Sequence, residues 1–138
     1  MDFRIWALLS AGFAGTTAIL AKKGIEGVPS NLALAVRVVV VLVFAVLIAF
    51  ITKETKLAQL TTRNWIFLTL SGIATGASWL CYFRALQMGP VSQVAPIDKL
   101  SFVLAMVLGF LLLKEKVTVN LGIGAVLIVA GVLITLKK

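Results

Sequence analysis

Long apolar stretches separated by short polar breaks run from one end of the 138-residue sequence to the other. Crossing the hydrocarbon core of a bilayer, about 30 Å thick, takes about 20 residues of helix. Five stretches reach that length, namely Phe3–Ala21, Leu32–Thr52, Asn64–Met88, Val91–Leu113 and Thr118–Leu136. Because lipid offers the backbone no hydrogen-bond partners, spanning stretches of this kind must be helices. The pattern predicts an all-α membrane protein, with five transmembrane helices in a single domain over residues 1–138.

Composition supports the same class of protein. Hydrophobic residues make up 61% of the chain and charged residues 13%, whereas a soluble domain carries about 25% charged residues. The net charge of +8 suggests nucleic acid at first sight. However, Lys and Arg fall mainly in short clusters between the apolar stretches, where membrane proteins carry them. We therefore expect the lipid bilayer as the surroundings and no nucleic-acid partner.

Enzyme chemistry has little support in the sequence. The chain has no His, no cluster of residues with metal-ligand spacing and no nucleophile beside a matching base. We expect no enzyme activity, no metal and no cofactor. The first apolar stretch is long for a signal peptide and is followed by Lys22 and Lys23, so we expect it to be a retained transmembrane helix.

The distribution of Lys and Arg gives almost no orientation signal. Five spans place the termini on opposite sides of the membrane, with six Lys and Arg on one side and seven on the other. Orientation normally follows an excess of these residues on the cytoplasmic side. We expect copies inserted in both orientations and paired as antiparallel homodimers, as in transporters built from two inverted repeats. A single orientation, decided by details of insertion, is the alternative.

A column of hydroxyl groups marks one face of the third predicted helix. The spacings of four, three and four residues place Ser71, Thr75, Ser78 and Tyr82 together, with Trp79 beside them. Such a face is a plausible wall for a small amphipathic solute, and we predict that these five residues bind the substrate. The alternative is an ordinary interhelical seam, in which Ser and Thr bond across helices for about 0.6 kcal/mol each.

Apart from Arg4 at the very start of the first predicted span, four charged residues fall inside the predicted spans, and all four belong to one end of the bundle. They are Arg37, Arg84, Asp98 and Lys99. Charge at membrane depth is costly and marks functional positions, so we predict that the four form a gate or coupling site. The hairpin at Gly89-Pro90 brings Arg84 and Asp98 to similar depth, where we expect an ion pair.

Both features also have plainer interpretations. Snorkelling to the interface would explain Arg37, and a purely structural pair would explain Arg84 and Asp98. Adjacent Asp98 and Lys99 point about 100° apart on a helix and need not pair with each other. Pro96, just before them, is expected to loosen the helix.

The last predicted helix carries Gly124 and Gly131, seven residues apart and therefore nearly superposed after two turns. Small residues at such spacing let two helix backbones approach closely. We predict that these two glycines form the seam of the homodimer.

The run SWLCYFRALQMGPVSQVAPIDKLS, followed by LLLKEK and GIGAVLIVAGVLI, resembles the EamA-type transporters of the drug/metabolite transporter superfamily. Pro29 and Arg37 near the second helix, Pro96 early in the fourth and Glu115 after it complete the pattern. The resemblance covers essentially the whole chain and implies one five-helix half of a protein that usually contains two inverted halves.

Small multidrug resistance proteins are similar four-helix chains that work as antiparallel dimers. Their last helix carries a Gly-x6-Gly strip, which Gly124 and Gly131 match. Their coupling Glu in helix one has no counterpart here, so drug-cation/proton exchange through that position is not implied. The Asp98-Lys99 pair is not general to EamA-type proteins.

These features together predict a secondary transporter, an exporter of small metabolites or drugs that works by alternating access as a dual-topology homodimer. We expect its partners to be a small-molecule substrate and a second copy of the chain. We place it in a prokaryotic inner membrane. Two other functions stay open, a membrane scaffold or assembly subunit and a lipid-linked carrier flippase.

Overall fold

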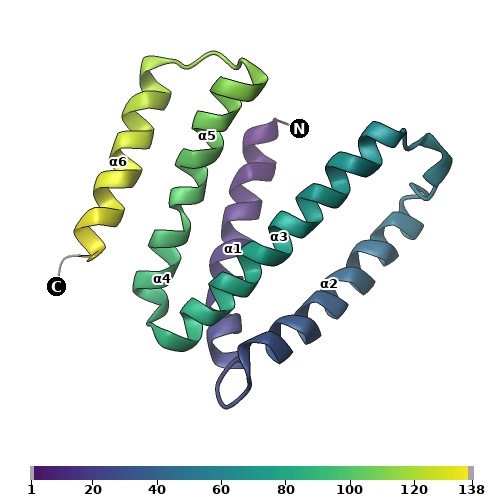
Figure 1. The fold of residues 1–138 in the computed structure, drawn as a ribbon, viewed down its shortest axis with the longest axis horizontal. Coiled ribbons are helices and arrows are strands. Elements are labelled where there is room, and N and C mark those ends of the chain that lie inside the picture. The colour runs from purple at the N-terminus through teal and green to yellow at the C-terminus, as the bar shows by residue number, and fades with distance from the viewer. Residues whose placement is uncertain (1, 137–138) are drawn as a thin grey trace. The chain divides into compact units, whose positions relative to one another are not determined.

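The computed structural model describes residues 2–136, and within them the chain is all helical, with no strand. Five helical segments are long and apolar enough to span a membrane, which confirms the predicted fold class and number of spans. The chain divides into two compact units, one ending at Met88 and the other beginning at Gly89 (Figure 1). The antiparallel homodimer stays a prediction.

The first unit contains α1 (Phe3–Gly24), α2 (Ser30–Ile51), the short 3-10 helix η1 (Leu57–Gln59) and α3 (Thr62–Met88). The predicted boundaries of the three long helices agree with these to within three residues. Helix α3 packs against both α2 and α1. It is therefore the central element of this unit.

A five-residue turn, 25–29, joins α1 to α2. Gly27 adopts a left-handed φ of +73°, which glycine reaches without the steric penalty that other residues meet. Pro29 follows as the N-cap of α2 with φ of −56°, a value that its ring already imposes. The turn therefore reverses the chain sharply and keeps the end of α1 close to the start of α2.

The second unit contains α4 (Val91–Asp98), α5 (Leu100–Leu113) and α6 (Val119–Leu136), and α6 packs against both α4 and α5. The fourth predicted span is thus interrupted at Lys99, three residues after Pro96. Pro96 has no N–H to donate to the preceding turn and its ring crowds that turn. At the break, the amides of Lys99 and Phe102 bond to carbonyls three residues back, each at 3.1 Å. The loosening predicted for Pro96 is confirmed.

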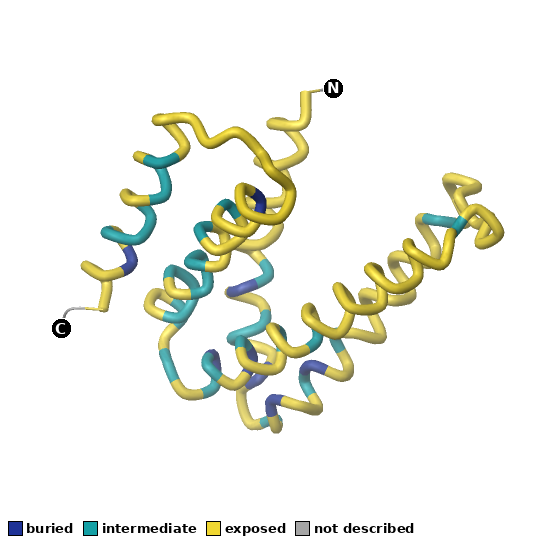
Figure 2. The backbone as a smooth tube through the Cα atoms, turned by 45° about the horizontal axis from the view of Figure 1, so that its top comes forward, coloured by how far each residue is buried: buried dark blue, intermediate teal, exposed yellow. Residues whose placement is uncertain are grey.

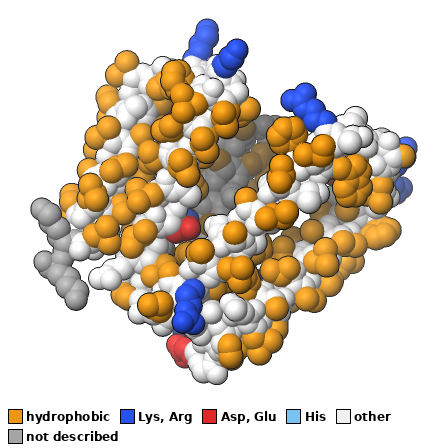
Figure 3. Space-filling view, in the orientation of Figure 1, with side chains coloured by type: hydrophobic (Ala, Val, Ile, Leu, Met, Phe, Trp, Pro, Cys, Tyr) orange, Lys and Arg blue, Asp and Glu red, His pale blue; other side chains and the backbone are white. Residues whose placement is uncertain are grey.

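Large hydrophobic side chains are exposed along every long helix. Figure 3 shows hydrophobic side chains spread over the helices on the face in view. Apolar exposure this extensive marks a surface that contacts lipid or partners rather than water.

The buried residues of the first unit gather where the end of α1, the start of α2 and the end of α3 meet (Figure 2). They are Ala18, Ile25, Ser30, Leu34, Phe83 and Leu86.

Candidate functional site

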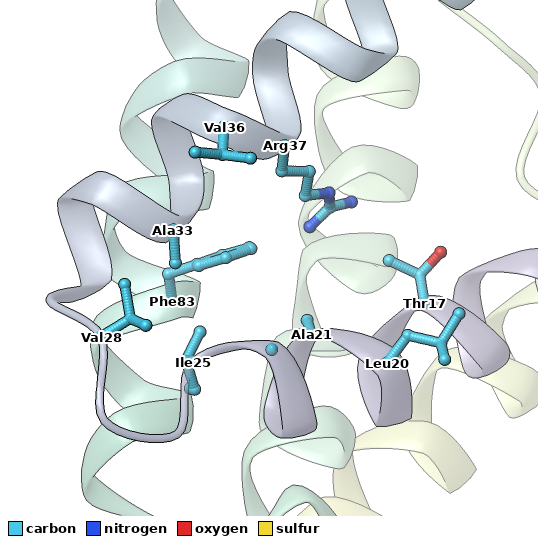
Figure 4. A pocket seen from close by; sticks show the side chains of 10 residues that line it. Thr17, Leu20, Ala21, Ile25, Val28, Ala33, Val36, Arg37 and Phe83 are labelled. Atoms are coloured by element: carbon cyan, nitrogen blue, oxygen red, sulfur yellow. The ribbon is translucent and has the colours of Figure 1, made fainter.

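A cavity of about 490 Å³ lies within the first unit, between α1, the 25–29 turn and the start of α2, with one aromatic ring contributed by α3. We call it the Arg37 cavity. Its lining residues are Thr17, Leu20, Ala21, Gly24, Ile25, Val28, Ala33, Val36, Arg37 and Phe83 (Figure 4). The volume falls within the range of about 300–1,000 Å³ that small-molecule sites occupy.

Arg37 is the charged residue of this cavity. Its guanidinium carbon lies 4.7 Å from the centroid of the Trp79 ring and 5.3 Å from that of Phe83. Both distances are within the range in which the negative face of an aromatic ring attracts a cation. Within residues 2–88, no carboxylate lies within ion-pair distance of Arg37. Aromatic faces, rather than a counterion, therefore stabilise this charge.

Two side-chain hydrogen bonds fix the end of α3 beside the cavity. The ammonium of Lys22 in α1 donates to the carbonyl oxygen of Leu86 at 2.5 Å, and the amide of Gln87 donates to the carbonyl oxygen of Val28 at 2.7 Å. The last carbonyls of a helix have no partner within it, and a cation there also favours the helix dipole. The two bonds join α1 and the turn to the C-terminal end of α3.

The core beneath the cavity comes from the same end of α3. Leu86 is fully buried and Phe83 is 2% exposed. Because Phe83 both packs in the core and faces Arg37, the position of the guanidinium depends on this packing.

Only part of the predicted solute wall on α3 lies near Arg37. Trp79 and Tyr82 are half-buried and Trp79 contacts Arg37, whereas Ser71, Thr75 and Ser78 are exposed. The Thr75 hydroxyl donates to the carbonyl oxygen of Ser71 at 2.9 Å, so its proton is engaged within its own helix. None of the five lines the Arg37 cavity, and their role in substrate binding stays a prediction.

In the second unit, Asp98 and Lys99 form an ion pair, with the Lys99 ammonium 3.5 Å from a carboxylate oxygen of Asp98. The ammonium also lies 5.1 Å from the centroid of the Phe102 ring. On a regular helix these neighbours point about 100° apart and need not pair. The break at Lys99 removes that geometry. Arg84 is exposed on α3, and its expected ion pair with Asp98 stays a prediction, as does the gate formed with Arg37 and Lys99.

Gly124 and Gly131 lie on α6, where a Cβ added at either position would meet no described atom within 4 Å. Gly124 is half-buried and Gly131 is exposed. The strip therefore has room for the close approach of another helix, and its use as a dimer seam stays a prediction.

Sequence reasoning missed the residues that build the Arg37 cavity around its arginine. From the sequence, Lys22 is expected only as a flanking charge, and no packing role is predicted for Phe83 or Gln87. The sequence does contain a signal, because the short turn with Gly27 and Pro29 keeps the two helices that it joins close together. A polar Gln87 at the end of an apolar helix was a second signal.

The chain is similar to known transporter proteins. The sequence profile of the EamA-like transporter family matches residues 4–137. A Sinorhizobium sp. protein described as an uncharacterized transporter in the cobO 3' region is 46% identical over 134 residues, covering 96% of this chain and 95% of that protein. A probable 4-amino-4-deoxy-L-arabinose-phosphoundecaprenol flippase subunit ArnE, from Enterobacter sp. (strain 638), is 27% identical over 99 residues, covering 69% of this chain and 92% of that protein.

No solved structure matches the chain. The match to the family profile extends over nearly the whole length of the sequence, including all five membrane-spanning segments. The chain is therefore an integral membrane transporter that belongs to the EamA-like transporter family.

Proposed function

We propose that the protein is a secondary transporter that exports small metabolites or drugs across a bacterial inner membrane by alternating access. The observation that carries this proposal is the Arg37 cavity, a space of small-molecule size that holds a cation within membrane-spanning helices. A charge within a spanning helix is costly, up to about 2.5–3.5 kcal/mol at the helix centre on insertion scales, and such charges mark functional positions. The bacterial relatives support the choice of membrane.

The working unit in this proposal is a homodimer of two copies in opposite orientations. Many transporters consist of two inverted repeats around a midplane site, and the single five-helix chain supplies one repeat. The near-even split of Lys and Arg between the two sides and the open strip at Gly124 and Gly131 support this arrangement.

Asp98 is our proposed coupling residue, within a gate formed with Lys99, Arg84 and Arg37. Protonation of the Asp98 carboxylate removes the charge that holds Lys99 at 3.5 Å. The interrupted helix then has two arrangements, with the pair closed or open. Ser71, Thr75, Ser78, Trp79 and Tyr82 line the solute path on α3 in this scheme.

Flux through proteoliposomes tests the proposal. A thermal-shift screen of the purified protein against metabolites first selects compounds that raise its stability, since a ligand of the native state does so. We expect those compounds to cross proteoliposome membranes in response to a pH gradient. The Asp98→Asn variant should lose the pH-driven component while remaining a folded dimer. Unchanged pH-driven rates in this variant would refute the coupling role, and flux no faster than in protein-free liposomes would refute transport.

Orientation has its own test. Single cysteines placed at exposed Glu26 and Gln59, on opposite sides of the membrane, replace the native thiol in a Cys81→Ala background. A membrane-impermeant thiol reagent should label both positions from each side if copies insert both ways. Labelling of each position from one side alone would exclude the antiparallel dimer.

A second candidate function is transport of a lipid-linked carrier, favoured by the relative described as a flippase subunit, which aligns with 69% of this chain. The same relative supports an assembly subunit that needs a different partner chain. Flux by the purified protein alone would argue against the need for such a partner.

A further inference from the structure

The wall of the Arg37 cavity has a strongly uneven chemistry. Apart from the guanidinium of Arg37 and the hydroxyl of Thr17, its side chains are apolar. They include large groups on three sides, among them Leu20 of α1, Ile25 of the turn and Phe83 of α3. Figure 4 shows the Arg37 side chain extending from α2 into this space. A ligand that fills it meets one cation and a mainly hydrocarbon surface.

The charge of Arg37 is not neutralised inside the first unit. The acidic residue nearest in the chain to the cavity wall is Glu26, which is exposed in the turn and does not lie within ion-pair distance of Arg37. Of the other cations at this end, Lys22 directs its ammonium to the carbonyl oxygen of Leu86, and Lys23 and Arg84 are exposed. The local charge around the cavity is therefore positive.

The aromatic contacts hold the guanidinium without using up its donors. Trp79 and Phe83 interact through their ring faces, which attract the cation as a whole. The N–H groups of a guanidinium point outward in its plane, in a fork that matches a carboxylate or phosphate with two parallel hydrogen bonds. Arg37 is thus oriented and still able to bind an anion.

We propose that the Arg37 cavity binds an amphiphile with one anionic group, a carboxylate or a phosphate. That group pairs with Arg37 while the apolar part lies against Leu20, Ile25 and Phe83. The inference deepens the proposed function, on which it rests, by naming the chemical class of the substrate. It also excludes a class, because a cationic amphiphile would meet like charge where the anion meets opposite charge.

Trp79 supplies a reporter at the proposed site. The other two tryptophans, Trp6 and Trp65, are 61% and 52% exposed and can be replaced by Phe, which leaves Trp79 as the single fluorophore. The protein in a neutral maltoside detergent is titrated with dodecyl phosphate, and with dodecyltrimethylammonium as a matched amphiphile of opposite charge. We expect a saturable change in Trp79 fluorescence with the phosphate and none with the ammonium. Equal responses to both would overturn the proposal.

Two substitutions test the role of the guanidinium. Arg37→Gln should weaken binding of dodecyl phosphate at least about tenfold, as expected when a hydrogen-bonded charge pair is lost. Arg63→Gln is the matched control, because Arg63 also lies over an aromatic ring, 5.7 Å from the centroid of Phe67, and its replacement lowers the net charge equally. The control should bind as the parent protein does. Equal affinities in the two variants would overturn the proposal.

A charge-preserving variant covers the case in which Arg37→Gln does not fold. Ala33 lines the cavity, and Ala33→Leu fills part of the space without removing Arg37. Binding of dodecyl phosphate should weaken several-fold, whereas binding that is unchanged would place the amphiphile elsewhere and contradict the proposal.

The anion can be a single-chain amphiphile added to the solution or a lipid of the bilayer, and nanodiscs distinguish these two sources. The Trp79-only protein is placed in phosphatidylcholine discs, and dodecyl phosphate or increasing phosphatidylglycerol is added. A response to either anion supports the site and identifies its source, whereas a response to neither overturns it. Because these assays need no transport, flux without binding would refute this inference alone, and binding without flux would refute only the proposed function.

Discussion

Arg37 and Lys99 are both cations within membrane-spanning segments, and the two units of the chain accommodate them in opposite ways. Lys99 has a carboxylate from the preceding residue at 3.5 Å and an aromatic ring from three residues later. Arg37 has two aromatic rings from α3, more than 40 residues away in the sequence. No carboxylate of residues 2–88 lies within ion-pair distance of it. One site is a neutral pair formed locally, and the other is a net charge held by tertiary packing.

The difference bears on what each site can do. A paired charge leaves little net attraction for a ligand unless the pair opens, which suits a coupling switch. A cation held by ring faces retains its electrostatic attraction for an anion. The Arg37 site must also depend on the packing of α1, α2 and α3, whereas the Asp98–Lys99 site depends on a break that Pro96 causes within a single segment.

The largest expected effect concerns that dependence on packing. Leu86 is fully buried beside the cavity, and replacing a buried Leu with Ala typically costs 2–5 kcal/mol. Leu86→Ala should therefore lower the free energy of unfolding by about 3 kcal/mol and disturb the Arg37 site. Unfolding in mixed micelles with increasing SDS, followed by circular dichroism, measures the change.

The matched control is Leu80→Ala on the same helix, since Leu80 is 47% exposed and should cost far less. Comparable losses at the two positions would contradict the view that the end of α3 is the core of the first unit.

The same contrast explains which features the sequence could predict. The five spans follow from segment length and apolarity alone, and the break follows from Pro96, because both are properties of contiguous residues. The charges Arg37, Arg84, Asp98 and Lys99 stand out in the sequence because any charge in such a segment is unusual.

The partners of these charges were harder to predict. Finding Trp79 and Phe83 over Arg37 requires the rotation of α3 against α2. No local pattern predicts that rotation, because α2 has no polar side chain from Val38 to Ile51. The Lys22 bond to Leu86 joins residues 64 apart and depends on that same packing. Amphipathic periodicity, which fixes such rotations in soluble proteins, is weak where both faces of a helix are apolar.

A smaller effect is expected at Lys22. Its ammonium donates to the Leu86 carbonyl oxygen at 2.5 Å, and hydrogen bonds to charged groups contribute about 1.5–3 kcal/mol. Because Lys22 is only half-buried, we expect Lys22→Met to destabilise the protein by about 1.5 kcal/mol, at the lower end of that range. The neighbouring Lys23→Met is the control, since Lys23 is exposed. SDS unfolding of both variants checks this, and equal losses would mean that a second cation at this end serves as well.

The smallest predicted effects are changes in the free energy of unfolding that have opposite signs at the two sites. Arg37→Gln removes a charge that has no counterion within the first unit, and with it the cation–π contacts. A charge costs up to about 2.5–3.5 kcal/mol in a spanning helix, the value at the helix centre, whereas cation–π contacts contribute from about 0.5 to about 2 kcal/mol. In the absence of ligand, the variant should therefore be more stable by about 1 kcal/mol, although its anion binding is weakened.

At the Asp98–Lys99 site, the expected change in the free energy of unfolding has the opposite sign. Asp98→Asn leaves Lys99 without its partner and should lower the free energy of unfolding. The loss should be at most about 1 kcal/mol, because the pair is 35–40% exposed. The double variant Asp98→Asn/Lys99→Gln should regain most of that loss, since no unpaired charge remains. SDS unfolding of the three variants in ligand-free micelles gives the signs. A loss of stability in Arg37→Gln would mean that Arg37 is held for packing, which would remove the physical ground for treating its charge as available to a ligand.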